Sequence, residues 1–357
     1  MLGLYVHIPF CKKKCFYCDF VSIEYLEEIV DNYLKALQIE SLKYKKAKVD
    51  TIYIGGGTPS VLSIVQLEKL ISIIKTNFNV SNIQEFTIEL NPESTTKEKL
   101  EFLYKSNISR ISFGLQSIFD DNLNILGRLH NYEKFKRVYY CAKEIGFINI
   151  NVDLIYGIPN QTLQNWTDTL KEVINLDSQH ISLYPLTVET NTLFYKKNIE
   201  PNTDLQAKMY NLACKILKEN NFKHYEISNW AKEKKHSKHN KLYWQNQEYI
   251  GLGTGAASYY KRYRYKNNTN VLKYIENLFN NKNIVIEKEY ITDELYKKEN
   301  IMLGLRLSEG VDIEYFKDKR DILNKYVMDK MLVIINNKVK FTEQALFVSN
   351  TIISDLL

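Results

Sequence analysis

Long apolar runs are absent from this sequence of 357 residues. Lys, Asn or Glu interrupts every hydrophobic stretch before it approaches the roughly 20 residues that a membrane-spanning helix requires. Internal repeats and low-complexity tracts are absent as well. We therefore expect a soluble protein without a transmembrane segment, whose length favours two domains or one large α/β barrel with an appendage.

Cysteine is also scarce. The chain has five, an odd number, and Cys141 and Cys214 stand alone inside helix-like stretches, which argues against a disulfide framework. No signal peptide opens the sequence, so we expect a cytoplasmic protein. The net charge of +6 is mild, and we expect no nucleic-acid partner from it.

The sequence does contain an alternation of short β-branched or aromatic runs with amphipathic helical stretches. The strand-like runs are "LGLYVHI", "VDTIYIGG", "EFTIEL", "SRISFGL", "INVDLIYGIP" and "HISLYPL". Six such strands with helical crossovers predict a parallel sheet covered by helices, either doubly wound or curled into a partial barrel. After a second region of mixed elements, two helices and a hairpin with Asn336–Asn337 at its turn predict a small helix-plus-wing domain.

Glycine and polar residues follow the ends of these strands. They are Gly55–Thr58, Glu89 before Asn91–Pro92, Gln116, Asp153 before Gly157, and Thr187. In parallel α/β sheets, ligands bind at the carboxyl ends of the strands. The sequence therefore predicts one binding site at this edge of the sheet.

Three of the five cysteines lie within the ten residues "CKKKCFYCDF". Thiolates select zinc or iron–sulfur clusters, and a short loop between ligands costs little entropy to close. Structural zinc needs a fourth Cys or His, but no second Cys-x2-Cys pair exists, and His7 alternates with Tyr5 on a predicted buried strand, which indicates a core residue. In a four-iron cluster, Cys11, Cys15 and Cys18 leave one iron open for a substrate or cofactor.

The cysteine spacing after the first strand, with "GGGTPS" after the second, resembles the radical S-adenosylmethionine superfamily. The resemblance implies a partial (β/α)6 barrel and a [4Fe–4S] cluster whose fourth iron is chelated by S-adenosylmethionine (SAM). An electron from the cluster would then break the sulfonium carbon–sulfur bond and give a 5′-deoxyadenosyl radical. The glycines agree with this, because without Cβ atoms the backbone can approach a ligand closely.

Motifs over nearly the whole chain resemble the coproporphyrinogen-oxidase-like branch of this superfamily and, within it, the HemW-type heme chaperones. They include "LYVHIPFC", "IYIGGGTPS", "LGRLH", "LYPLTVETNTLF", "HNKLYW" and "IMLGLRLSEGV". The resemblance implies SAM contacts at Tyr5, Tyr17, Gly56, Gly57, Thr58, Glu89, Gln116, Arg128, Asp153 and Thr187.

The oxygen-independent coproporphyrinogen III oxidase is the main alternative within this branch. Its pattern continues to a further cysteine two places after the third ligand, where this chain has Phe20. It also carries a long arm before its cluster motif, whereas ten residues precede Cys11 here. Because porphyrin decarboxylation needs a radical held close to its substrate and away from water, these differences favour the chaperone. A radical enzyme that modifies RNA, motivated only by the mild basic charge, is a third hypothesis.

The "HNKLYW" stretch supports the chaperone hypothesis. An exposed histidine with aromatic neighbours can ligate heme iron while lysines meet the propionates. We expect His239 rather than His236 to be this ligand, since the family motif begins at the second histidine. Ala257 and Ser258 occupy the place where relatives usually have a histidine and its neighbour, which predicts weaker ligand binding or a greater dependence on His239.

The predicted organisation is a partial barrel with the cluster over residues 1–190, a connecting α/β region with the heme motif over 191–290, and a C-terminal helix-plus-wing domain over 291–357. The predicted function is heme binding and delivery to an acceptor protein. The cofactors expected are a [4Fe–4S] cluster, SAM and heme, and the partners are the acceptor and an electron donor, neither of which the sequence identifies.

The spacing of the three thiolates generates a first prediction. Replacing Cys11, Cys15 and Cys18 by alanine removes every protein ligand of the cluster, so the variant should lack the brown absorbance of anaerobically reconstituted protein. Iron and sulfide contents equal to those of the wild type would contradict it.

Overall fold

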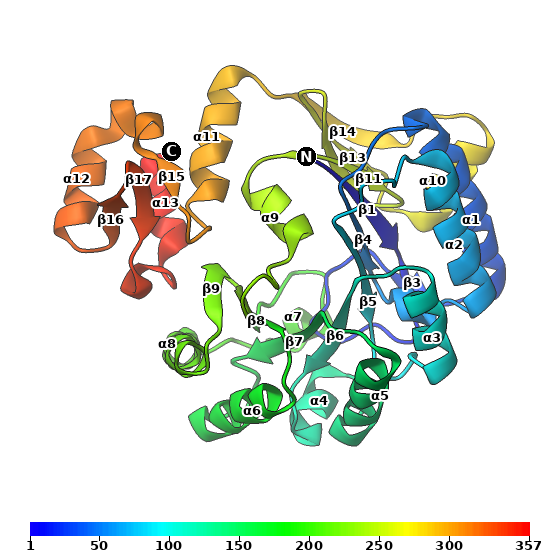
Figure 1. The fold of residues 1–357 in the computed structure, drawn as a ribbon, viewed down its shortest axis with the longest axis horizontal. Helices are drawn as coiled ribbons and strands as arrows, with labels where there is room; N and C mark the ends of the chain where they lie inside the picture. Colours follow the sequence, from blue (N-terminus) through cyan, green and yellow to red (C-terminus); the bar gives the residue numbers. More distant parts are fainter.

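A single mixed sheet forms the centre of the computed structural model, which describes residues 1–357. The strands are β1 Leu2–Ile8, β2 Phe10–Cys11, β3 Ile23–Glu24, β4 Thr51–Gly56, β5 Glu85–Leu90, β6 Arg110–Gln116, β7 Ile150–Tyr156, β8 His180–Pro185, β9 Lys223–Glu226, β10 Asn229–Ala231, β11 Glu248–Leu252, β12 Ala257–Tyr260, β13 Tyr263–Asn267, β14 Val285–Tyr290, β15 Val311–Asp312, β16 Leu332–Ile335 and β17 Lys338–Phe341. Twelve of them pair in the order β14-β13-β12-β11-β1-β4-β5-β6-β7-β8-β10-β9 (Figure 1). Pairing is parallel from β11 to β8 and antiparallel outside these strands.

Helices connect the parallel strands and lie along the convex side of the sheet (Figure 1). The α-helices of the whole chain, including those that make no such connection, are α1 Glu27–Ser41, α2 Ile64–Asn77, α3 Lys97–Lys105, α4 Asp120–Leu126, α5 Tyr132–Ile145, α6 Leu163–Asn175, α7 Leu193–Lys196, α8 Thr203–Glu219, α9 Lys238–Trp244, α10 Val271–Phe279, α11 Asp293–Gly304, α12 Arg320–Met328 and α13 Ser349–Leu356. The six predicted parallel strands β1 and β4–β8 are confirmed. The sheet does not close, because β14 and β9 end its strand order, so the barrel is partial as predicted.

Alternation of residue types along the strands separates the two faces of the sheet. On β5, Phe86 and Ile88 belong to the main hydrophobic core with the surrounding helices, whereas Glu85 and Glu89 lie on the opposite, concave face and bond to groups there. The same alternation recurs on the neighbouring strands. The helices cover the apolar face, and the polar face lines the inside of the partial barrel.

Helix α6 illustrates why the covering helices form where they do. The Thr162 side chain caps its first turn by accepting the backbone N–H of Asn165. Trp166, Leu170 and Val173 then recur at helical spacing and are all fully buried. The cap thus determines where the helix begins, and the apolar stripe determines which of its sides packs against the core.

The chain after β8 extends the same sheet at both of its sides. Strands β10 and β9 add to β8, whereas β11 pairs with β1 and leads into β12–β14. Residues 232–247 connect these two sides and include α9, which lies on the concave side against β1, β4 and β11 (Figure 1). Helix α9 therefore occupies the interior of the partial barrel near the amino ends of the strands.

The C-terminal segment forms a separate small core. Strands β15, β17 and β16 make a three-stranded sheet packed with α11, α12 and α13. Asn336 and Asn337, with φ of 52° and 60°, form the tight turn between β16 and β17. The predicted hairpin with these asparagines at its turn is confirmed.

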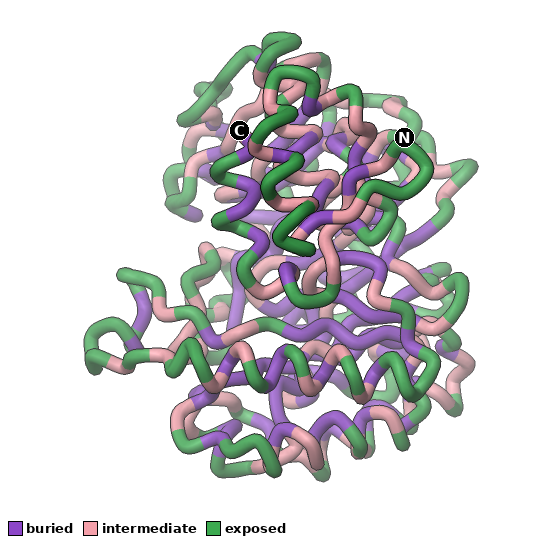
Figure 2. The backbone as a smooth tube through the Cα atoms, turned by 90° about the vertical axis from the view of Figure 1, so that its left-hand side faces the viewer, coloured by how far each residue is buried: buried purple, intermediate pink, exposed green.

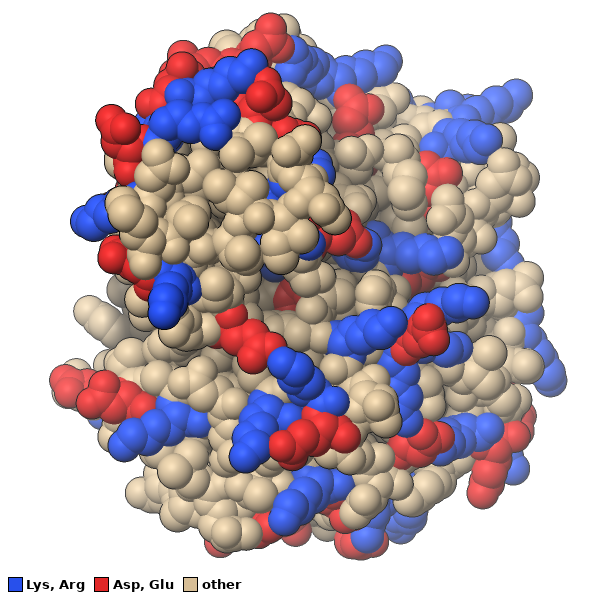
Figure 3. All heavy atoms as spheres, turned by 60° about the vertical axis from the view of Figure 1, so that its left-hand side comes forward, with Lys and Arg blue, Asp and Glu red and all other residues tan.

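The molecule has no helix suited to cross a membrane, because none combines the length and the apolarity that crossing a bilayer demands. The face drawn in Figure 3 has no large area of a single charge sign. Figure 2 shows that buried residues lie in the interior of the molecule, whereas exposed residues lie on its outer turns and loops. Basic and acidic side chains are interspersed over the face drawn in Figure 3.

Candidate cofactor site

A pocket of about 420 Å³ opens at the carboxyl ends of β4–β8, where the sequence predicted a binding site. The predicted residues that line it are Cys11, Cys15, Cys18, Tyr17, Gly56, Gly57, Thr58, Glu89, Gln116, Arg128, Asp153 and Thr187. The fold thus brings together side chains from five strands and from the cysteine loop. Two predicted residues, Tyr5 and His239, do not line this pocket.

The cysteine loop follows β2 at the rim of the pocket. Cys11 is buried, Cys15 and Cys18 are half-buried, and none forms a disulfide. Burial raises the pKa of Cys11, and it raises the pKa of Cys18 to about 11, so a metal has to displace protons when it binds.

The arrangement of the three thiols suits a cluster better than a single ion. No group of three Cys, His, Asp or Glu side chains converges closely enough to hold one metal ion. A four-iron cluster does not need such convergence, because each thiolate binds a different iron. Thr58 Oγ1 donates to Cys11 Sγ (3.4 Å) and Arg128 Nη1 donates to Cys15 Sγ (3.5 Å), which favours thiolates.

The glycine turn after β4 lies directly against the cysteine loop. Gly56 has a φ of +120°, a conformation that residues with a Cβ rarely adopt. A Cβ on Gly57 would lie 2.9 Å from the Phe10 carbonyl oxygen and 3.0 Å from Cys11 Sγ. Backbone bonds fix the contact, since Gly57 N–H donates to Ile8 O (2.9 Å) and Thr58 N–H to Phe10 O (2.9 Å). Glycine is therefore required here for the two loops to meet.

Glu89 places a carboxylate at the end of β5. Its Oε1 accepts the Tyr53 hydroxyl (2.8 Å), and its Oε2 accepts the Gly56 N–H (3.2 Å). Burial is the main cause that raises the pKa of Glu89 to about 7, and the negative charge of Asp153 adds to it. The side chain is thus poised to gain a cationic partner, which would restore its ionised form.

Asp153 places a second carboxylate two strands away, on β7. Ser112 Oγ donates to its Oδ2 (2.9 Å), and Asn151 Nδ2 donates to its Oδ1 (2.8 Å). Burial raises the pKa of Asp153, and these hydrogen bonds oppose the shift. Both oxygens are therefore held in fixed positions while they still face the pocket.

Arg128 ties the loops around the pocket to one another. Its Nη2 donates to Asn91 Oδ1 (2.7 Å) and to the Gly114 carbonyl oxygen (2.8 Å), while Asn91 Nδ2 donates to Thr58 Oγ1 (3.0 Å). The Nε of Arg128 is buried without a partner. A fixed guanidinium with an unused donor suits an anionic ligand group such as a carboxylate.

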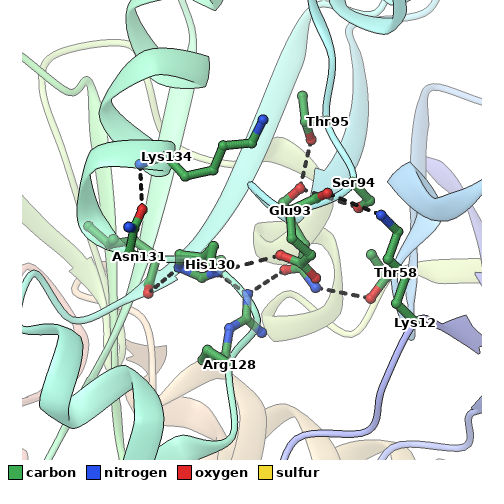
Figure 4. Close-up of polar contacts among 12 residues, drawn as sticks. Lys12, Thr58, Glu93, Ser94, Thr95, Arg128, His130, Asn131 and Lys134 are labelled. Atoms are coloured by element: carbon green, nitrogen blue, oxygen red, sulfur yellow. Dashed lines mark hydrogen bonds and ion pairs between the residues drawn. The ribbon is translucent and has the colours of Figure 1, made fainter.

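A second group of polar contacts lies close to Arg128 and joins His130, Glu93 and Lys12 (Figure 4). His130 Nδ1 lies 3.4 Å from Glu93 Oε2, and its Nε2 lies 3.2 Å from the Leu115 carbonyl oxygen. Lys12 Nζ, from the cysteine loop, donates to the Glu93 carbonyl oxygen (3.2 Å). In Figure 4, His130 approaches Glu93 from one side and Lys12 from the other.

Gln116 reaches the pocket through an unusual backbone conformation. Its φ is +73°, and the pairing of β6 with β7 shifts register between Gly114 and Gln116. A positive φ is uncommon for a residue with a Cβ and is concentrated at functional sites. The bulge turns the Gln116 side chain toward the pocket, where the sequence predicted it.

Tyr5 and His7 lie below the pocket on the concave face of β1. The Tyr5 hydroxyl lies 2.9 Å from His7 Nδ1, and His7 Nε2 lies 2.8 Å from the Val21 carbonyl oxygen. The Tyr5 ring packs beside the Tyr53 ring, with 6.2 Å between centroids. His7 is buried, so its prediction as a core histidine is confirmed.

The expectation that His239 is an exposed imidazole is wrong. The residue is fully buried within the barrel, at 0% exposure. Its Nδ1 lies 2.8 Å from Thr51 Oγ1 and its Nε2 lies 2.8 Å from the Tyr243 hydroxyl, while its backbone N–H donates to Glu85 Oε1 (3.1 Å). Burial lowers the pKa of His239 to about 3. A motif of charged and aromatic residues predicted a surface loop, but tertiary packing of α9 placed it inside.

His236 and the Ala257 position lie away from the pocket as well. His236 is half-exposed, and its ring stacks on Tyr225 with 4.3 Å between centroids. Ala257 and Ser258 are part of β12, and Ser258 Oγ accepts the Gly251 N–H (2.8 Å). Neither residue lines the pocket, so their departure from the family pattern does not alter its wall.

Asn91, which the sequence placed at a strand end, lines the pocket and bonds to Thr58. Two further lining residues that bond to predicted ones, Tyr53 and Ser112, were missed in the sequence. Tyr53 and Ser112 are two and four places from strand-end residues on the same face, so strict period-two alternation was the signal that could have identified them.

Comparisons with known proteins identify the family and the fold. The model of the Radical SAM superfamily matches residues 5–173. The heme chaperone HemW of Lactococcus lactis is 35% identical over 95% of this chain and 91% of its own length, and that of Bacillus subtilis is 37% identical over 89% and 87%. In structure, the radical SAM enzyme coproporphyrinogen III oxidase (HemN) of Escherichia coli has a TM-score of 0.88 and covers 99% of this chain and 89% of its own. Its identity of 21% means that this likeness shows the fold alone.

The pKa of Glu89 predicts how SAM binding should depend on pH. The ammonium group of SAM favours the ionised carboxylate, whereas a bound proton competes with it. With a pKa of about 7, affinity should be full at higher pH and fall as the pH drops below 7, by up to about tenfold per unit. Titration calorimetry on anaerobically reconstituted protein between pH 6 and 8 measures this.

A Glu89→Gln variant tests whether Glu89 causes this dependence on pH, because glutamine keeps the shape of the side chain and cannot titrate. It should bind SAM more weakly at pH 8 and show a much smaller dependence on pH. An Asp153→Asn variant is the comparison: it should keep a dependence on pH but move it to lower pH, because the negative charge of Asp153 raises the pKa of Glu89. An unchanged slope in Glu89→Gln would assign the titration to another group.

Proposed function

The chain belongs to the radical SAM superfamily and, within it, to the HemW family, and we propose that it binds heme and transfers it to an acceptor protein while holding a [4Fe–4S] cluster and SAM. The observation that carries this proposal is the match to HemW heme chaperones along nearly the full length of both chains. The pocket supports it, because the cysteine loop, the glycine turn and the paired carboxylates line one cavity.

Cys11, Cys15 and Cys18 would hold three of the four irons of the cluster. When bound, the cluster supplies an open iron for SAM and a route for one-electron reduction of its sulfonium. The hydrogen bonds from Thr58 and Arg128 to the sulfurs stabilise the thiolates that such binding requires.

The remaining polar groups suit the parts of SAM according to their distance along the site. Glu89, bonded to the glycine turn that contacts Cys11, would bind the ammonium, and Arg128, bonded to Cys15, would bind the carboxylate. Asp153, two strands farther along the sheet, and Gln116 would bind the ribose hydroxyls. Thr187 lies at the pocket wall beyond β8 and would contact the adenosine end.

Oxidative decarboxylation of coproporphyrinogen is the second candidate function, favoured by the fold shared with HemN. Phe20 lies at the pocket rim and is 63% exposed, in the place where the oxidase pattern has a cysteine. The rim therefore lacks the further thiol of the oxidase pattern and presents an apolar ring to solvent at that place.

An anaerobic assay with coproporphyrinogen III separates the two functions. Reconstituted protein with SAM and a chemical reductant should give no divinyl product, because the chaperone carries its porphyrin unchanged. Loaded HemN provides the positive control under the same conditions. Accumulation of the divinyl product at a comparable rate would replace the chaperone proposal with the oxidase.

His239 stays the proposed heme ligand, with a condition that its burial imposes. Both ring nitrogens are engaged with Thr51 and Tyr243, so the imidazole reaches heme iron only when α9 moves away from β4. The lysines at positions 232, 234, 235, 238 and 241 around this segment would then meet the heme propionates.

Hemin titration followed by the Soret band tests this ligand. His239→Ala should reduce the Soret shift strongly, because the axial nitrogen is lost. His236→Ala is the matched control, and it should leave the shift unchanged. An identical spectrum for His239→Ala and the wild type would remove His239 from the heme site.

A further inference from the structure

Beneath the pocket, a continuous chain of hydrogen bonds runs from Asp153 to the segment that precedes α9. Asn151 Nδ2 donates to Asp153 Oδ1 (2.8 Å), and Asn151 Oδ1 lies 2.5 Å from His180 Nδ1. His180 Nε2 lies 2.7 Å from the Tyr225 hydroxyl, which accepts the Ser237 N–H (3.2 Å). Asn151, His180, Tyr225 and Ser237 are all buried, with exposures of 2%, 0%, 3% and 0%.

The contacts at the two ends of this chain constrain the protons between them. The Ser237 N–H donates to the Tyr225 oxygen, and the acceptor within reach of the Tyr225 proton is His180 Nε2, so the hydroxyl donates there. His180 then carries its own proton on Nδ1 and donates it to Asn151 Oδ1. Burial, and then the positive charge of Arg110, lower the pKa of His180 well below its ordinary value, so the imidazole stays neutral.

The donated proton decides which way the Asn151 amide faces. Asn151 Oδ1 faces His180 and also accepts the Ser182 hydroxyl (3.0 Å). The amide nitrogen is left to donate to Asp153 and to Ser112 Oγ (2.7 Å). A reversed amide would place its oxygen against the Asp153 carboxylate and its N–H₂ against the His180 N–H. Both contacts would be repulsive, so the imidazole holds the amide in one orientation.

We propose that His180 is a positioning residue for SAM, which acts through Asn151 to hold the Asp153 carboxylate in the orientation that binds the ribose hydroxyls. The inference rests on the proposed function, since it takes Asp153 as a SAM contact. His180 touches no pocket space itself, because it lies at the start of β8 while the pocket lies at the opposite ends of the strands.

The same chain gives α9 a link to the pocket. Ser237 is the N-cap of α9, and the Glu85 carboxylate accepts the backbone N–H groups of Lys238 (2.9 Å) and His239. The helix that carries the "HNKLYW" motif therefore begins where the hydrogen-bond chain ends. Withdrawal of α9 would remove the Ser237 donor and, with it, the constraint on the tautomer of His180.

Two variants test the two hydrogen bonds of the His180 ring separately. His180→Asn keeps an amide donor at the position of Nδ1 and loses the contact to Tyr225, whereas His180→Gln keeps an acceptor at the position of Nε2 and loses the donor to Asn151. SAM affinity, measured by calorimetry on reconstituted protein of matched iron content, should stay within about twofold of wild type for His180→Asn and weaken about tenfold for His180→Gln.

L-Methionine supplies a readout that a merely structural role would not give. It has the amino and carboxylate groups of SAM but no ribose, so its affinity should be the same in wild type and His180→Gln. His224→Gln makes the same chemical change on β9, which β10 separates from β8, where His224 stacks on Trp230, and it should leave both affinities unchanged.

The outcomes separate the failure of this inference from the failure of the proposed function. Wild-type protein that binds no SAM would overturn the proposed function, and the role of His180 with it. Wild-type protein that binds SAM, with His180→Gln equally tight or with SAM and methionine weakened alike, would overturn the positioning role alone. Reversal of the ranking, with His180→Asn the weaker binder, would also overturn it.

Discussion

Polar side chains buried on the concave face of the sheet must find partners within the barrel, and this requirement shapes the rest of the molecule. The amino ends of the strands carry Thr51, Glu85, Arg110, Asn151 and His180, all of them buried. An open barrel would leave such groups facing water or one another. Helix α9 closes that end, where the His239 imidazole bonds to Thr51, and the Ser237 hydroxyl with the backbone N–H groups of Lys238 and His239 bonds to Glu85.

The opposite end of the same face stays open, and its polar groups remain available to a ligand. Glu89 and Asp153 each keep bonds to the protein while facing the pocket, and burial raises the pKa of both. One polar face therefore has two uses along its length. Its lower part bonds mainly to other groups of the protein, although Arg110 Nε and Nη1 have no partner there, and its upper part faces the pocket.

The likeness to HemN shows how little the fold decides between oxidase and chaperone. The whole chain shares the fold of HemN, while its similar relatives include heme chaperones HemW. Under the proposed function, we expect the two activities to differ through side chains at the pocket rim and in the interior helix. Exposed Phe20 at the rim and buried His239 in α9 are the two positions where the chemistry of this chain is most specific.

The sequence by itself determined the parallel strands, the cysteine loop and most of the pocket, because these depend on local signals: period-two alternation, thiol spacing, and glycines at strand ends. It did not reveal the chain from His180 to Asp153, whose members come from distant segments. It also misplaced His239, because "KEKKHSKHN" has the composition of a solvated loop. Only the tertiary structure decided that α9 folds into the barrel, since the partners that stabilise it there, Thr51 and Glu85, lie on strands more than 150 residues earlier in the chain.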